Sequence, residues 1–274
     1  MKYNFDEIIN RKGTNALKTD ALAARYGNAE LIPLWVADMD FKSPPAITEA
    51  IIERAHHGIF GYTCASQEYY NSIINWVNRH HNWQIQQEWI TFIPGIVKGI
   101  AFVLDCFTSK DHQIIIQPPV YHPFRIIPTL HHRIVVDNPL TLEAGQYKMD
   151  LEGLKNIINP ASKVLILCNP HNPGGRVWTR QELIDIAGIC YEHKILVISD
   201  EIHSDLAFAP HKHIPFASVS EKAAQNSITF MAPSKTFNIA GIVSSYSIIP
   251  NDELRKKFNK YLESSELDEG HIFA

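Results

Sequence analysis

Hydrophobic and polar positions divide the chain into short apolar runs separated by longer segments with helical spacing. The apolar runs predict strands over residues 90–93, 114–116, 134–136, 164–167, 195–198, 228–231 and 243–249. The remaining periodic segments predict helices over residues 45–57, 67–81, 96–107, 180–192 and 252–263. Because strands and helices alternate, we expect an α/β fold, with a largely parallel seven-stranded sheet flanked by helices.

Two of the predicted helices begin at recognisable start signals. Pro44 and Pro45 open the first helix, and proline is tolerated in a first turn because the N–H that it lacks would have no helical partner there. Thr179 and Glu182 have the spacing of a capping box, in which each side chain binds the other's backbone N–H. The stretch before Phe41 shows no regular pattern.

Composition and charge exclude several classes of protein. The 274 residues are 45% hydrophobic and 20% charged, with a formal net charge of -4 and no long run of one sign. This composition suits a globular protein with a sizeable core and does not favour binding to nucleic acid or a membrane surface. No apolar stretch has the length of a membrane span, and the N-terminus lacks the apolar core of a signal peptide, so we expect a cytoplasmic protein.

Cysteine and histidine positions do not predict a metal site. None of the four cysteines forms a C-x-x-C pair, and Cys106, Cys168 and Cys190 lie in apolar runs, which favours buried, reduced thiols. Six of the 14 histidines stand in adjacent pairs, and adjacent side chains point apart on a helix or a strand. We therefore expect no metal cofactor.

Three polar motifs follow predicted strands in a fixed order. They are CNPHNPGG at residues 168–175, SDEIH at residues 199–203 and SKTFN at residues 234–238. Open α/β sheets bind ligands at the carboxyl ends of their strands, so we expect these motifs to meet at one edge of the sheet. They offer a carboxamide, a carboxylate, an imidazole and an amine, which is the set of groups needed to hold pyridoxal phosphate.

Lys235 and Asp200 are the strongest candidates in these motifs. Burial or a nearby cation lowers the pKa of a lysine and frees its amine for a covalent bond to a carbonyl carbon. A carboxylate at the end of an apolar strand needs a partner, and the protonated ring nitrogen of the cofactor would supply one for Asp200. Asn172 follows a buried strand and is a candidate donor to the phenolic oxygen of the cofactor.

Other candidates have simpler alternatives that the sequence leaves open. His203 either contacts the phenolic oxygen, orients a neighbour or is a structural histidine. Tyr121 follows a strand and either stacks on the cofactor ring or packs within its loop. Gly95 and Ile96 open an apolar helix whose first N–H groups suit a phosphate, and Ser234 would add a hydroxyl.

The motifs and their order resemble the fold-type I pyridoxal-phosphate enzymes of the class I and II aminotransferase superfamily, and more closely the MalY/PatB-type cystathionine β-lyases. The resemblance extends from Phe5 to about Phe258. The similar stretches are residues 33–41, 57–63, 118–124, 168–176, 200–206 and 234–241.

The resemblance implies a role for each candidate residue. Lys235 matches the lysine that binds the cofactor covalently, Asp200 the partner of the ring nitrogen, and Asn172 the donor to the phenolic oxygen. Tyr121 matches the aromatic residue that stacks on the ring. His203 falls where related aminotransferases carry a tyrosine that binds the phenolic oxygen.

The resemblance also implies how the phosphate is held and how the chain associates. Gly95 and Ile96 match the backbone that binds phosphate, and Tyr62 matches a tyrosine that reaches the phosphate of the neighbouring subunit. Family members are typically homodimers with active sites at the interface. Residues 1–50 are then expected to contribute to a small domain and to dimer contacts, and residues 51–274 to form the large cofactor-binding domain.

The sequence departs from the family pattern at several points. Val243 stands where many relatives have a phosphate-binding arginine, and Ala232 where many have a serine, so phosphate binding would depend on backbone groups, Ser234 and Tyr62. Family members continue through a C-terminal segment that completes the small domain and carries the arginine for the substrate carboxylate. We expect this small domain to be incomplete here, with that arginine beyond Ala274.

Three functions are consistent with these residues. The leading hypothesis is a pyridoxal-phosphate-dependent carbon–sulfur β-lyase that cleaves cystathionine or cysteine conjugates to a thiol, pyruvate and ammonia. Lys235 would be its general base, with Tyr121 as a second residue at the reacting atoms. The alternatives are an aminotransferase, which would require a keto acid, and a catalytically impaired protein that acts by binding a partner.

Overall fold

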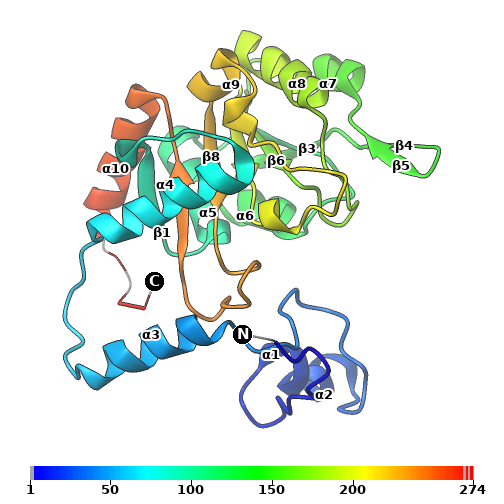
Figure 1. The fold of residues 1–274 in the computed structure, drawn as a ribbon. Coiled ribbons are helices and arrows are strands. Elements are labelled where there is room, and N and C mark those ends of the chain that lie inside the picture. The colour runs from blue at the N-terminus through cyan, green and yellow to red at the C-terminus, as the bar shows by residue number, and fades with distance from the viewer. Residues whose placement is uncertain (1–2, 268–269, 271, 274) are drawn as a thin grey trace.

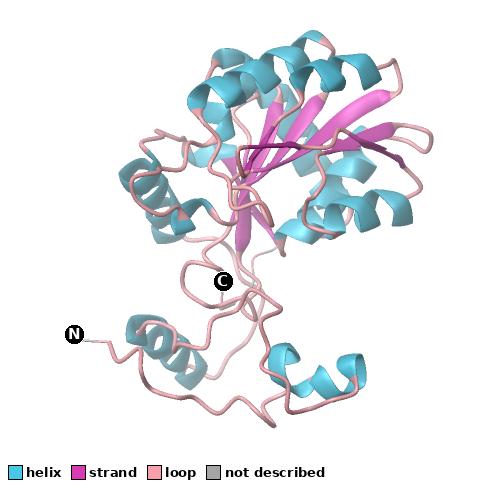
Figure 2. Ribbon diagram, turned by 90° about the vertical axis from the view of Figure 1, so that its right-hand side faces the viewer, coloured by secondary structure: helices cyan, strands magenta, loops and turns pink. Residues whose placement is uncertain are grey.

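A seven-stranded sheet with helices on both faces forms the centre of the computed structural model, which describes residues 3–267, 270 and 272–273 (Figures 1 and 2). The strand order is β1–β9–β8–β7–β6–β2–β3. Its strands are β1 Ile90–Ile93, β2 Gln113–Ile116, β3 Ile134–Asp137, β6 Ser162–Cys168, β7 Leu196–Asp200, β8 Ser227–Met231 and β9 Ser245–Ile248. Strand β9 is antiparallel to both neighbours and the other pairs are parallel, which confirms the predicted largely parallel sheet.

The predicted helices all form, with ends within one residue of the prediction. They are α3 Pro45–His56, α4 Gln67–His81, α5 Ile96–Phe107, α8 Arg180–Glu192 and α10 Asp252–Ser264. Helix α8 begins at the predicted capping box: the Thr179 side chain accepts from the backbone of Glu182, whose carboxylate accepts from the backbone of Thr179.

Several short elements were not predicted from the pattern. They are α1 Leu17–Asp20, α2 Leu22–Tyr26, α6 Pro123–Leu130, α7 Leu151–Ile157, α9 Glu221–Gln225 and the hairpin of β4 Thr141–Glu143 with β5 Gln146–Lys148. Helices this short depend on packing more than on local propensity. In α6 the interior Pro128 argues against a helix, yet Phe124 is fully buried and fixes the segment against the core.

Both faces of the sheet are apolar because helices cover both. Successive side chains of a strand point to opposite faces, so Ile114 and Ile116 pack in one cluster with Leu104 of α5. Ile115 points the other way and packs in a second cluster with Leu183 of α8. This explains why the central strands show no polar alternation in the sequence.

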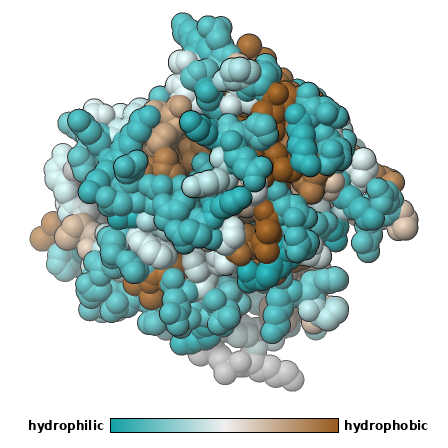
Figure 3. Space-filling model, turned by 90° about the horizontal axis from the view of Figure 1, so that it is seen from above, coloured by the Kyte–Doolittle hydropathy of each residue, from teal (hydrophilic) through white to brown (hydrophobic). Residues whose placement is uncertain are grey.

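Helices α1, α2 and α3 lie apart from this body, below the sheet in Figure 1. Large apolar side chains are exposed throughout this region, with Ile8 98% and Leu34 94% exposed. The others are Tyr3, Phe5, Leu17, Tyr26, Leu31, Ile32, Val36, Phe41, Ile52, Ile59, Phe60 and Tyr62. Seen from above in Figure 3, the body is mainly hydrophilic, with hydrophobic residues in separate patches.

The cysteines are all free thiols. Cys168 and Cys190 are buried as predicted, Cys106 is partly buried, and Cys64 is exposed. Within the described part of the chain, no helix has both the length and the apolar character needed to cross a bilayer.

Candidate active site

The carboxyl ends of the parallel strands meet at one edge of the sheet, and the predicted site residues follow these ends. Gly95 follows β1, Tyr121 follows β2, and Asn172 follows β6. Asp200 is the last residue of β7, and Lys235 comes four positions after the end of β8. The topology therefore brings residues from five separate parts of the sequence to one edge, as open α/β sheets do at their ligand sites.

Asp200 is a buried carboxylate at the centre of this edge. Only 5% of the residue is exposed, and its Oδ1 accepts a hydrogen bond from the backbone N–H of Ile202 at 3.1 Å. Burial raises the pKa of Asp200 to about 7, with the neighbouring Glu201 adding to the effect and the Ile202 N–H and Lys235 opposing it. A cation placed against this carboxylate would restore its charge.

Lys235 lies in a tight turn that presents its amine to the site. The backbone N–H of Phe237 donates to the carbonyl of Pro233 at 3.0 Å. The Lys235 amine donates to the carbonyl oxygen of Ala37 at 3.2 Å. Burial lowers the pKa of Lys235, although Asp38 and Asp200 oppose this effect. The amine is therefore easier to deprotonate than an exposed lysine.

His203 and Tyr121 lie within electrostatic range of these two residues. Burial lowers the pKa of His203, and the positive charge of Lys235 lowers it further. Burial raises the pKa of Tyr121, and the negative charge of Asp200 adds to this. The Tyr121 ring packs edge-on against Phe124, with ring centres 5.9 Å apart.

Asn172 is fixed through its backbone and has a free side chain. Its backbone N–H donates to the Cys168 thiol at 3.2 Å, and its carbonyl accepts from the Tyr121 N–H at 3.0 Å. Among the described residues, no hydrogen bond involves the side-chain amide of Asn172. This amide is available to a ligand at the same edge as Asp200.

Gly95 forms the turn before α5, and its own N–H is already bonded within the chain. Its φ of 104° lies in the region that favours glycine. Its N–H donates to the Ser245 hydroxyl at 2.9 Å and to the Ile93 carbonyl at 2.8 Å. The N–H groups of Ile96 and the next residues of α5 have no intrahelical partner, so they are the groups suited to an anion. Ser234 belongs to the turn that carries Lys235.

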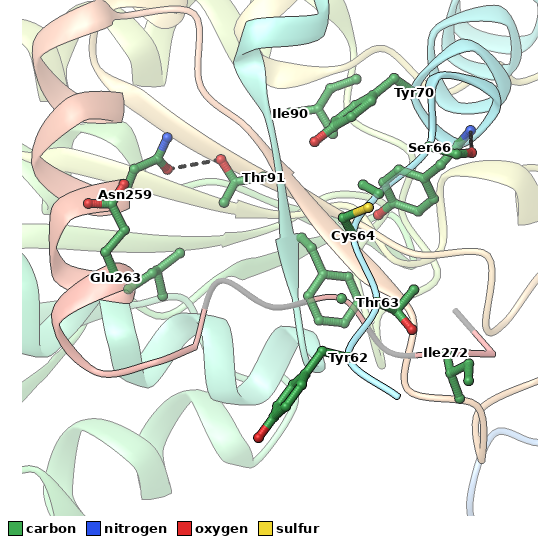
Figure 4. Close-up of a pocket in the computed structure, with 15 residues that line it drawn as sticks. Tyr62, Thr63, Cys64, Ser66, Tyr70, Ile90, Thr91, Asn259, Glu263 and Ile272 are labelled. Atoms are coloured by element: carbon green, nitrogen blue, oxygen red, sulfur yellow. Dashed lines mark hydrogen bonds between the residues drawn. The ribbon is translucent and has the colours of Figure 1, made fainter. Parts of the chain in front are cut away.

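Tyr62 lines a cavity to which none of the other predicted site residues contributes. It is 96% exposed and lines a cavity of about 750 Å³ with Ile90 and Thr91, at the amino end of β1 (Figure 4). The Thr91 hydroxyl donates to the Asn259 side chain at 3.0 Å on the other side of this cavity. Among the described residues, no hydrogen bond, ion pair or ring contact joins Tyr62 to Lys235 or to the other predicted site residues.

Several residues around Lys235 were not selected from the sequence. Asn238 bonds the backbone of Met39 and Phe41, which places the N-terminal segment beside the turn. Thr236 bonds Asp205, which lies after β7. Asp205, Thr236 and Asn238 all belong to the stretches that resemble the family, and their position there was the only available signal.

Comparison with known proteins assigns the chain to a family. The chain belongs to the family of class I and II aminotransferases. The sequence model of this family matches residues 29–264. It is 44% identical over 272 residues to "Cystathionine beta-lyase PatB" of Bacillus subtilis, covering 99% of this chain and 70% of that protein. It is 30% identical over 266 residues to the protein MalY of Escherichia coli, covering 96% of this chain and 67% of MalY. These findings confirm the resemblance seen in the sequence.

A solved structure agrees with these relatives. The crystal structure of cystalysin from Treponema denticola, described as containing a pyridoxal 5'-phosphate cofactor, has a TM-score of 0.93 and 35% identity to this chain. The match covers 99% of this chain and 69% of cystalysin. It confirms the predicted fold class.

The residues at the edge fit pyridoxal phosphate. Asp200 is a buried carboxylate that lacks a cationic hydrogen-bond partner among the described residues, which suits a protonated ring nitrogen. The Asn172 amide is free to donate to an oxygen, and the half-buried Lys235 amine has a lowered pKa. The contact of each residue with the cofactor stays a prediction.

Proposed function

We propose that this protein is a pyridoxal-phosphate-dependent carbon–sulfur β-lyase that cleaves cystathionine or cysteine conjugates to a thiol, pyruvate and ammonia. The observation that carries the proposal is the placement of Lys235, Asp200 and Asn172 at one edge of the sheet. The identity to a protein named cystathionine β-lyase supports the choice of reaction. The chain spans 70% of the length of that relative. The activity test below is therefore made on these 274 residues themselves.

The cofactor, when bound, supplies an electron sink for bond cleavage at the substrate Cα and Cβ. Lys235 would hold the cofactor covalently and then, as a free amine, move the proton at the substrate Cα. Asp200 would keep the proton on the ring nitrogen, because a buried carboxylate stabilises an adjacent positive charge. Asn172 and His203 would bind the phenolic oxygen, and Tyr121 would cover one face of the ring.

The phosphate would be bound mainly by neutral groups. Within one chain, we assign phosphate binding to two sets of groups. They are the first N–H groups of α5, beginning at Ile96, and the Ser234 hydroxyl. Tyr62 would complete the site of a neighbouring subunit in a homodimer. The exposed apolar side chains of residues 3–62 support such an association, because a monomer in water rarely exposes so many. The domain division at residue 50 and the cytoplasmic location stay predictions.

The test is a visible absorption spectrum of the purified chain with added pyridoxal phosphate. Borohydride reduction and peptide mapping then locate the attached cofactor, which we expect on Lys235. Pyruvate release from cystathionine without any added keto acid would establish the lyase. A strict requirement for a keto acid would establish the aminotransferase instead, and cofactor scattered over surface lysines would overturn the proposed site.

Lys235→Arg is the matched variant for this test. Arginine keeps the positive charge but stays protonated, so it neither attaches the cofactor nor moves the Cα proton. We expect pyruvate release to fall by about 100-fold to 10,000-fold, the usual contribution of a positioned acid–base group. Lys256→Arg, an exposed change on α10, should leave the activity unchanged.

A further inference from the structure

A side-chain hydrogen bond links the residue next to Lys235 to a carboxylate that the proposed reaction does not use. The Thr236 hydroxyl donates to Asp205 Oδ2 at 2.7 Å. Asp205 lies in the short turn Ser204–Leu206, directly after the loop that carries Asp200 and His203. The bond therefore joins the loop after β7 to the turn after β8, one residue away from the reactive amine.

Helix α4 holds the other side of the Asp205 carboxylate. The indole N–H of Trp76 lies 3.2 Å from Oδ1 and 3.1 Å from Oδ2, and His81 Nε2 lies 3.0 Å from Oδ1. Burial alone would raise the pKa of Asp205, but the contacts with His81, Thr236 and Trp76 outweigh it and lower the pKa. The carboxylate is therefore charged at neutral pH and fixed in one orientation.

Packing covers only part of the Lys235 turn on the side that faces α4. A cavity of about 230 Å³ lies against the turn, and Trp76, Asp205 and Phe237 are among the residues that line it. The rings of Trp76 and Phe237 meet edge-on beside this pocket, with centres 5.2 Å apart, and the pocket leaves the rest of this side of the turn without packed neighbours. The hydrogen bond from Thr236 to Asp205 adds a polar attachment of the turn beside this pocket.

We propose that Asp205 is a positioning residue that acts through Thr236 to hold the Lys235 amine inside the site. The inference rests on the proposed function, since it gives Lys235 the reactive role. The charged groups that face the amine are Asp38 from the N-terminal segment and Asp200 from β7, with His203 beside them. Without the hydrogen bond, the turn moves into the cavity region and the amine gains water.

The test measures the ionisation of Lys235 in the cofactor-free chain. Trace acetylation at a series of pH values, quantified by mass spectrometry, gives the midpoint for Lys235, with the exposed Lys256 as internal reference. Thr236→Val keeps the shape of threonine and removes the hydroxyl. We expect its Lys235 midpoint to rise by about one pH unit toward the value of an exposed lysine, a tenfold loss of neutral amine at neutral pH. Thr236→Ser keeps the hydroxyl and should match the wild type.

Asp205→Ala is the second variant, and it removes both oxygens that could accept from Thr236. We expect its Lys235 midpoint to move in the same direction as in Thr236→Val. Near-ultraviolet circular dichroism confirms that each variant is folded. A wild-type midpoint in Thr236→Val, or equal shifts in Thr236→Val and Thr236→Ser, overturns the inference. So does a shift in Thr236→Val with none in Asp205→Ala.

The proposed function fails separately from this inference. Its own test is whether borohydride fixes pyridoxal phosphate on Lys235 of the wild-type chain. The midpoint comparison uses no cofactor, so it reports on the hydrogen bond whether or not the cofactor attaches.

Discussion

At the scale of single residues, the burial of Asp200 lowers the folding stability of the cofactor-free protein by a measurable amount. Its pKa of about 7 in the folded chain lies above the ordinary value of 3.8. The folded state therefore binds this proton more tightly than the unfolded state, and stability is lost as the pH rises from about 4 to about 7. We expect cofactor-free Asp200→Asn, which stays neutral, to be more stable than the wild type at pH 8 and to lose this advantage near pH 4.

Urea unfolding of the cofactor-free proteins at pH 4, 6 and 8 checks this. The difference in unfolding free energy between variant and wild type should grow by at most about 1.4 kcal/mol per pH unit across the window. Asp111→Asn is the control, because residue 111 is exposed and its left-handed backbone suits asparagine. A difference that stays constant with pH would mean that Asp200 titrates normally.

Residues with local signals were predictable at this scale, and residues with distant partners were not. Lys235, Asp200 and Asn172 could be selected because each follows a strand that is visible as an apolar run. The partner of Thr236 lies 31 residues away and the backbone bonded by Asn238 lies 199 residues away. Such pairs arise from the folded topology, and no spacing in one sequence reveals them.

At the scale of elements, Asn238 attaches the N-terminal segment to the Lys235 turn. Its side chain accepts from the Met39 N–H at 2.9 Å and donates to the carbonyls of Met39 and Phe41 at 3.1 and 2.7 Å. The same segment supplies the Ala37 carbonyl that accepts from the Lys235 amine. The Asn238 side chain therefore attaches residues 37–41 to the turn that carries the reactive lysine.

Asn238→Gly tests this attachment without adding backbone strain. The φ of residue 238 is 56°, a left-handed conformation that glycine adopts readily. Each lost hydrogen bond costs about 0.5–1.5 kcal/mol. We expect amide hydrogen exchange over residues 37–43 to become at least about tenfold faster, while exchange in α8 stays as in the wild type. Unchanged protection of residues 37–43 would show that other contacts hold the segment.

Long elements were predictable and short ones were not, for a physical reason. Helices such as α4 and α8 repeat their apolar spacing over several turns, and the capping box of α8 marks its start. Helices α6, α7 and α9 have at most eight residues, too few for the periodicity to stand out. The hydrophobic pattern also predicted the seventh strand, at residues 243–249, but not the direction in which it runs. This strand is β9, and it is antiparallel to both of its neighbours.

At the scale of the whole molecule, the position of Tyr62 predicts a shared active site. Tyr62 is 96% exposed and, among the described residues, makes no hydrogen bond to the groups at the Lys235 edge of its own chain, so in a homodimer it would act on the partner. Mixing inactive Tyr62→Ala with inactive Lys235→Arg then restores about a quarter of the wild-type sites, since half of the dimers are mixed and each has one intact site. Pyruvate release measured after refolding the mixture checks this.

Two outcomes of the mixing experiment contradict the shared site. The first is no recovery although light scattering shows mixed dimers. The second is a Tyr62→Ala variant with full activity on its own. A monomer by light scattering at working concentration would contradict the homodimer itself.

The place of β9 in the sheet has a consequence for how the protein is made. Strand β9 separates β1 from β8, so the strands that precede Gly95 and Lys235 are joined only through β9 within the described sheet. A ribosome delivers β1 about 150 residues before β9, and β1 has no edge to join in that interval. The binding edge is therefore assembled only after β9 has been synthesised, and a nascent chain halted before residue 245 has no complete pocket in which the cofactor could assist folding.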